Sequence, residues 1–214
     1  GFTTYWSAYV YKNHKEEQKK ICKMHDYVEV FAIFAMSGLV CFRDLVYLII
    51  GSEFHEGKTI FSTLMVASAL NFVRETTGVG VALAKKNQIT LAVHTVSVII
   101  NIIGCYFLTS ICGIRGAAYA NAISAVVLYT LMTRFGQKFY KSLVDIKRSF
   151  LGILILLVIL FVPSITNKMA IIIPVALLMD LVTVIMFRNQ IGVMLKGLGT
   201  TVESYFSHRK GDQI

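Results

Sequence analysis

The sequence is poor in the residues that interrupt helices and in those that build disulfide or metal sites. Its 214 residues include two prolines and four cysteines. With so little proline, long helices are sterically allowed along most of the chain. The cysteines form no CxxC pair and no four-ligand metal pattern; they are Cys22, Cys41, Cys105 and Cys112. The sequence therefore predicts small packing cysteines, and neither a metal site nor a cofactor is expected.

Charged residues are scarce as well, at 15% of the chain against 56% hydrophobic residues. A helix needs about 20 mostly apolar residues to cross about 30 Å of hydrocarbon. Stretches of that kind predict six complete spans, at about 28–50, 58–84, 90–112, 115–134, 149–166 and 169–187. Residues 1–11 are expected to be the last turns of a seventh span. The sequence thus predicts an all-α fold, a polytopic transmembrane helix bundle with about six complete spans and a partial N-terminal one.

The formal net charge of +9 is concentrated in alternate connections between the predicted spans. Sixteen of the 21 Lys and Arg residues lie in segments 12–26, 85–88, 134–148 and 188–210. The other connections carry three, which are Lys58, Arg115 and Lys168. Cytoplasmic loops of membrane proteins carry such an excess of basic residues, so the four basic segments are predicted to be cytoplasmic. Membrane topology accounts for the charge, and nucleic acid is not expected as a partner.

The chain begins at Gly1 within a predicted helix, with no initiator methionine. Its first residues lack the basic, apolar and small-residue regions of a signal peptide. We therefore expect the chain to be the C-terminal part of a longer protein.

Four features of the sequence resemble one transporter family. They are GVGVALAKKNQ at 78–88, Asn101 in the helix that follows, GIRGAAYANAIS at 113–124, and the upstream DLVYLIIGSEF at 44–54. Their order and spacing are similar to those of the polysaccharide-transport branch, the O-antigen flippase-like proteins, of the multidrug/oligosaccharidyl-lipid/polysaccharide exporter superfamily. The resemblance covers about residues 40–130. One departure is Thr109-Ser110, where relatives usually place a proline before the outer glycine turn.

The resemblance implies a bundle of two six-helix lobes around a central cavity that works by alternating access. Residues 1–140 would be second-lobe helices of the flippase core, 141–190 two accessory transmembrane helices, and 191–214 a cytoplasmic tail. The first lobe would precede Gly1. The implied substrate is an undecaprenyl-pyrophosphate-linked glycan in the bacterial cytoplasmic (inner) membrane. Membrane lipids are implied as partners, together with a glycan polymerase or glycosyltransferases.

Arg74 and Glu75 are the first candidates for substrate binding. An ionisable group in mid-membrane costs about 2.5–3.5 kcal/mol on insertion scales, so it usually faces a cavity or a partner. Successive helical side chains point about 100° apart, so one of the two is expected to face the cavity and the other a neighbouring helix. Arg74 suits a diphosphate, because its guanidinium stays charged and donates paired hydrogen bonds. A structural ion pair between helices is the alternative.

Three further polar residues lie within predicted spans. Asp180 is predicted to be either a proton- or cation-coupling site or a helix-pairing contact. His94 is either a hydrogen-bonded packing residue or a pH-sensitive group. Asn101 is expected to bond across helices. Arg43 and Asp44 lie nearer the outer interface, where long arginine side chains reach toward water.

Small residues within the family-like motifs are predicted to bring helices close together, since membrane helices associate largely through close packing. They are Gly78, Gly80, Gly113, Gly116, Ala117 and Ala118. Gly113 and Gly116 are also expected to form the outer turn.

The main functional prediction is a flippase for lipid-linked oligosaccharide or polysaccharide repeat units. A cation-coupled drug exporter and a peptidoglycan-precursor flippase are alternatives within the superfamily. The alternative from another class is a membrane glycosyltransferase or acyltransferase, which needs a polar catalytic loop with paired carboxylates or a His–Asp pair. Only His25-Asp26 offers such a pair, and the outer connections are short. The chain is therefore not expected to be an enzyme.

Overall fold

The computed structural model describes residues 2–50, 57–58, 60–166 and 168–193, and within them the chain forms helices and turns but no strand. The helices are α1 (Phe2–Asn13), α2 (Gln18–Cys41), α3 (Arg43–Ile50), α4 (Phe61–Thr77), α5 (Val79–Leu83), α6 (Asn87–Cys112), α7 (Ile114–Phe139), α8 (Ile146–Ile165) and α9 (Met169–Met186). The all-α prediction is confirmed. Most of the tail predicted at 191–214 lies outside the described residues. The same is true of most of residues 51–58, which connect the first two predicted spans.

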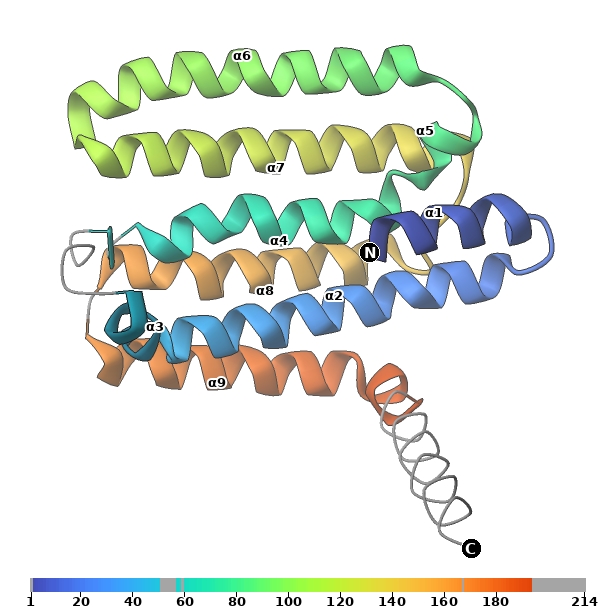
Figure 1. Cartoon of the computed structure of the whole chain (residues 1–214). Helices are drawn as coiled ribbons and strands as arrows, with labels where there is room; N and C mark the ends of the chain where they lie inside the picture. Colours follow the sequence, from blue (N-terminus) through green and yellow to red (C-terminus); the bar gives the residue numbers. More distant parts are fainter. Residues whose placement is uncertain (1, 51–56, 59, 167, 194–214) are drawn as a thin grey trace, which may run out of the picture.

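Five of these helices, α2, α6, α7, α8 and α9, are long and apolar enough to cross a membrane. They lie side by side with α4 in Figure 1. The chain is a multi-pass membrane protein. The remaining predicted span, at 58–84, contains α4, which has 17 residues.

The connections at each end of the bundle match the distribution of charge. Those joining α1 to α2, α5 to α6 and α7 to α8 lie at one end, on the right in Figure 1, and α9 also finishes there. The α6–α7 and α8–α9 connections lie at the opposite end. The basic segments 12–26, 85–88 and 134–148 therefore lie at one end of the bundle, the distribution expected of cytoplasmic connections.

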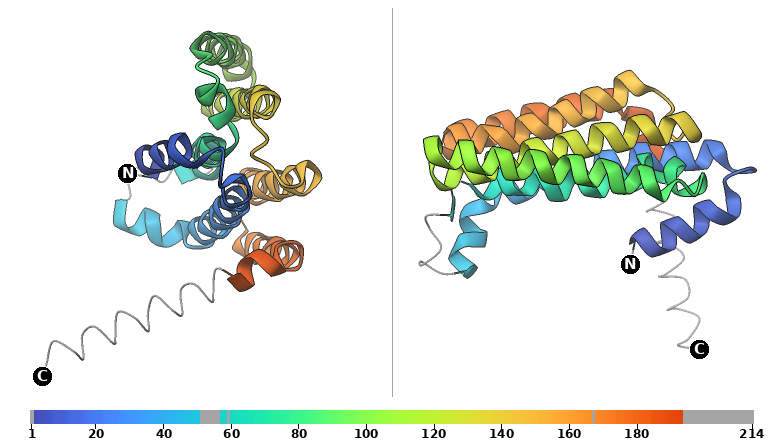
Figure 2. Two further views of the ribbon diagram at one scale, coloured as in Figure 1. Left: turned by 90° about the vertical axis from the view of Figure 1, so that its right-hand side faces the viewer. Right: turned by 90° about the horizontal axis from the view of Figure 1, so that it is seen from above.

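The apolar core lies among α2, α4, α7, α8 and α9. The α8 side chains of Leu156, Ile159 and Leu160 are at most 1% exposed, so α8 is a central helix of this core. By contrast, α6 lies at the edge of the bundle (Figure 2), and its buried residues are Val93 and Ser97.

Three predicted segments differ from the observed helices. The helix that contains the start of the span predicted at 28–50 runs from Gln18 and ends at Cys41. The chain then turns, and α3 runs across the end of the bundle (Figure 2). Charge explains the turn. The side chain of Arg43 is buried, whereas that of Asp44 is exposed, and its Oδ1 lies 2.7 Å from Lys58 Nζ at this end of the bundle.

The span predicted at 58–84 is interrupted at Gly78, between α4 and α5. Residues 135–148 were expected to form the largest basic loop. Instead α7 continues to Phe139 and α8 begins at Ile146, where the carboxylate of Asp145 accepts hydrogen bonds from the first backbone N–H groups.

Backbone contacts at two glycines bring α7 against its neighbours. A Cβ atom built on Gly116 would lie 2.0 Å from the carbonyl oxygen of Leu108 in α6. A Cβ atom built on Gly80 would lie 2.1 Å from the carbonyl oxygen of Gly136 in α7. Only glycine fits at either position, so the predicted packing role describes these two residues well.

The other small residues of the motifs differ in their surroundings. Gly113 makes the turn between α6 and α7 with φ of +60°, a conformation that glycine adopts most easily, and a Cβ there would touch nothing within 4 Å. The prediction that Gly113 packs helices together is therefore wrong, because its role is in the turn. Gly78 ends α4, Ala118 is buried and Ala117 is partly buried.

We expect Gly116→Ala to destabilise the protein by about 1–3 kcal/mol or more, because the added methyl group collides with backbone that cannot rotate away. Thermal unfolding in detergent, followed by circular dichroism, measures this. The matched control is Gly38→Ala in α2, where a Cβ would meet nothing within 4 Å. Equal unfolding temperatures for the two variants would contradict the close contact of α6 with α7.

Candidate functional site

Arg74 lies near the C-terminal end of α4 and reaches toward α6. Its Nη1 donates to Nε2 of His94 at 3.4 Å, and its Nη2 lies 3.5 Å from Oε1 of Glu75. Because a guanidinium has no acceptor, Nε2 of His94 must be unprotonated in this contact. Nε of Arg74 is buried and has no hydrogen-bond partner. The guanidinium therefore has a free donor.

Arg74 and Glu75 do not diverge as the helix geometry predicts. Both side chains line one cavity of about 160 Å³ and form an ion pair across it. Their flexible side chains bridge the angle between their Cα–Cβ bonds. We call this the Arg74 cavity; its walls are Ser7, Tyr11, Arg74, Glu75, Gly78, Val79, Ala82, Thr90 and Met132.

Helix α1 forms one side of the Arg74 cavity, and two hydrogen bonds hold it there. Nε1 of Trp6 donates to the carbonyl oxygen of Glu75 at 3.2 Å. The hydroxyl of Tyr11 donates to the carbonyl oxygen of Ala82 at 2.9 Å. The segment predicted as the last turns of a seventh span thus contributes to the wall of the site.

A second cavity, of about 240 Å³, lies between α4 and α6 over α7. We call it the asparagine groove; it is lined by Ala67, Asn71, His94, Ser97, Val98, Asn101, Asn121, Ser124, Ala125 and Leu128. Nδ2 of Asn101 donates to the hydroxyl of Ser124 at 3.2 Å, as expected for a bond between helices. Most of its polar lining consists of uncharged amides and hydroxyls.

The two cavities meet where Arg74 contacts His94. Arg74 lines the first cavity and His94 the second, and a hydrogen bond joins them. Four of the predicted residues therefore form one polar track along α4 and α6: Arg74, Glu75, His94 and Asn101. The track begins at the basic end of the bundle, close to the Lys85-Lys86 turn, and leads toward its middle.

Asp180 lies apart from this track, on α9. The hydroxyl of Ser37 in α2 donates to its Oδ2 at 2.7 Å, and its Oδ1 is buried without a partner. The contact joins α2 to α9, which is the geometry of the helix-pairing alternative.

Sequence patterns missed several polar residues. Asn71 and Asn121 lie in predicted spans, and their spacing relative to Asn101 gives no signal until α4, α6 and α7 are packed together. Glu29 was also missed, although it falls within the span predicted at 28–50. It lies well inside α2 and is fully buried. The i, i+4 pair that it forms with His25 was the available signal.

No family model matches the chain, and neither the curated proteins nor the solved structures yield a match. The exporter resemblance therefore stays a prediction.

The asparagine groove is expected to hold water. We predict that cysteine at Asn101 reacts with a membrane-impermeant maleimide at least about tenfold faster than cysteine at Ile102, because thiolates form in water and not in lipid. Ile102 is 63% exposed on the outer face of α6. Both variants are made in a background with the four native cysteines replaced by alanine. Equal rates at the two positions would contradict a hydrated groove.

Proposed function

We propose that the chain is the second lobe of a transporter that moves lipid-linked oligosaccharide or polysaccharide repeat units across the bacterial cytoplasmic membrane. The observation that carries this proposal is the position of Arg74, a permanent cation that lines a cavity between membrane helices. Its side chain is 17% exposed, and its buried Nε has no hydrogen-bond partner. Guanidinium binds phosphate oxygens through charge-assisted hydrogen bonds, so it suits the diphosphate of a lipid-linked glycan.

The rest of the polar track suits the glycan. Sugar hydroxyls both donate and accept hydrogen bonds, and the amide side chains of Asn71, Asn101 and Asn121 do the same. Exposed Lys85 and Lys86, beside the start of α6, would attract lipid phosphates by about 1 kcal/mol each. Basic side chains would thus bind the phosphates of a lipid-linked glycan, and amide side chains along the same track would bind its sugars.

Alternating access requires a second wall, and the proposal assigns it to a first lobe of the same protein. Asn71 is exposed although it lines the groove, so the groove opens to one side there. The proposed partners are this first lobe, membrane lipids around the exposed apolar side chains of α6 and α9, and the polymerase or glycosyltransferases that handle the glycan.

One observation bears on the drug-exporter alternative. Glu75 lines the Arg74 cavity, and a carboxylate there would attract an organic cation. Its charge is offset by Arg74 at 3.5 Å, so Glu75 does not present an unpaired carboxylate to an organic cation. For the enzyme alternative, the side chains of His25 and Asp26 point to different partners, Thr76 and Ser149 for the first and Arg148 and Gln190 for the second.

Arg74→Ala is expected to lower the translocation rate about 10- to 100-fold, since a hydrogen bond to a charged group contributes about 1.5–3 kcal/mol. The translocation rate of Arg74→Lys is expected to lie between those of the wild type and Arg74→Ala, because lysine keeps the charge and loses the paired donors. The measurement is the flipping rate of a fluorescent lipid-linked glycan in proteoliposomes. The protein in these proteoliposomes is purified in the form in which its own host expresses it.

Arg134→Ala, at an exposed position on α7, is the matched control and should transport normally. Wild-type flipping by a well-folded Arg74→Ala protein would refute the role of Arg74. Loss of cationic dye export in Glu75→Gln, with glycan flipping unaffected by Arg74→Ala, would favour the drug exporter instead.

A further inference from the structure

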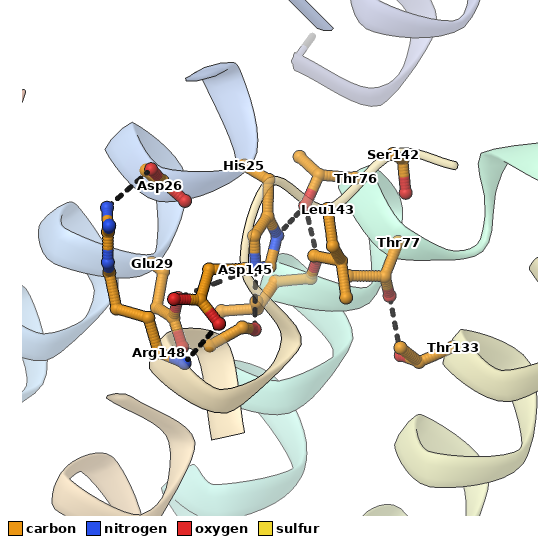
Figure 3. A network of polar contacts seen from close by, with 12 residues as sticks. His25, Asp26, Glu29, Thr76, Thr77, Thr133, Ser142, Leu143, Asp145 and Arg148 are labelled. Carbon is orange, nitrogen blue, oxygen red and sulfur yellow. Dashed lines mark hydrogen bonds and ion pairs between the residues drawn. The ribbon is translucent and has the colours of Figure 1, made fainter. Parts of the chain in front are cut away.

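A second polar cluster lies on the other side of α4 from the Arg74 cavity, around Glu29 of α2 (Figure 3). The Glu29 side chain is 0% exposed, and neither carboxylate oxygen has a hydrogen-bond partner. The nearest basic group is His25, one turn earlier on the same helix, with Nε2 at 3.4 Å from Oε2 of Glu29. His25 is also 0% exposed. A carboxyl group and an imidazole are thus enclosed together without access to water.

The hydrogen bonds of His25 show which of its nitrogens carries a proton in this arrangement. Nδ1 lies 2.8 Å from the hydroxyl oxygen of Thr76 in α4, and that hydroxyl donates its own proton to the carbonyl oxygen of Val73 at 2.7 Å. Thr76 can therefore only accept from His25, so Nδ1 carries a proton. The variable position is Nε2, which lies 2.8 Å from the hydroxyl of Ser149 in α8 and faces Glu29.

The other ionisable groups nearby do not supply a charge to balance Glu29. Asp26 is directed toward Arg148 of α8, at 3.6 Å, and accepts a hydrogen bond from Gln190 beyond the end of α9. The guanidinium of Arg148 also lies over the ring of Phe187. From α7 the titratable group facing Glu29 is Tyr129, a neutral phenol that is 8% exposed. The His25–Glu29 pair must therefore balance its own charge.

One proton makes the pair neutral. With none it holds a buried negative charge, and with two a buried positive charge, and both are costly away from water. The carboxylate of Glu29 receives no hydrogen bond in this structure, so the proton is better placed on Glu29 than on Nε2 of His25. Among the described residues there is no group of three or more His, Cys, Asp or Glu side chains that suits a metal ion, so a proton is the ligand that this chemistry favours.

The position of Glu29 links this proton to helix packing. A Cβ atom built on Gly152 of α8 would lie 2.4 Å from Oε1 of Glu29, so the carboxyl group is pressed against the α8 backbone. His25 meanwhile bridges α4 and α8.

We propose that His25 and Glu29 form a proton-binding site that holds one exchangeable proton, and that separation of α2 from α8 opens the site for exchange. The substrate class is a proton taken from and returned to water. The site goes beyond the proposed glycan transport and does not depend on it, because it is defined by residues outside the polar track.

The test is infrared difference spectroscopy of the full chain in lipid nanodiscs during a pH titration. We expect the wild type to show the C=O stretch of a buried, protonated carboxyl group at neutral pH, lost at high pH. Glu29→Gln should lose this band completely. The control Glu16→Gln, at an exposed position in the α1–α2 turn, should keep it. A folded wild-type protein without such a band at any pH would overturn the proposal.

Two further measurements keep the test decisive. If Glu29→Gln does not fold, Ser149→Ala should still shift the band, because it removes the hydroxyl beside Nε2 of His25; an unshifted band would count against the site. Replacing choline chloride by sodium chloride at constant pH should leave the band unchanged. Loss of the band with sodium would mean that the site binds an alkali cation, which also overturns the proposal. None of these outcomes depends on glycan flipping.

Discussion

The backbone contacts of α7 set the geometry on which the rest of the molecule depends. At the basic end the Gly136 carbonyl meets Gly80, and at the other end Gly116 meets the Leu108 carbonyl. Lipid gives apolar side chains no reason to prefer protein, so the fit between backbones decides how membrane helices associate. Because no side chain intervenes at these points, the spacing of α4, α6 and α7 is fixed. The width of the asparagine groove, and the reach of Arg74 to His94, follow from that spacing.

The last turn of α4 connects the two polar regions of the protein. Four consecutive residues of this turn each bond to a different part of the chain: Arg74 to His94, the carbonyl of Glu75 to Trp6, Thr76 to His25, and Thr77 to Thr133. Successive helical positions are about 100° apart, so four positions cover all sides of a helix. A rotation of α4 would therefore disturb the Arg74 cavity and the His25–Glu29 pair at the same time.

The sequence was sufficient to predict the helical class, the membrane location and four polar residues that lie together, Arg74, Glu75, His94 and Asn101, because charged and amide groups stand out in apolar segments. The sequence was insufficient where contacts between distant segments determine where a helix ends or which side chain is buried. Hydropathy continued the first span through Leu45 to Ile50, whereas the buried Arg43 and the Asp44–Lys58 pair turn the chain at Phe42. Glu29 was missed because its burial depends on α4 and α8, whose Thr76 and Ser149 contact its neighbour His25.

The turn at Gly113 has a consequence for how the protein enters the membrane. This single residue connects two helices of 26 residues each. With so short a connection, one helix cannot be embedded in the membrane while the other remains in water. During synthesis α6 and α7 must therefore be inserted as a pair, so Asn101 of α6 and Ser124 of α7 enter the bilayer with a hydrogen-bond partner already at hand. The hairpin is thus the smallest unit of this chain in which the polar groups of the groove can be inserted at low cost.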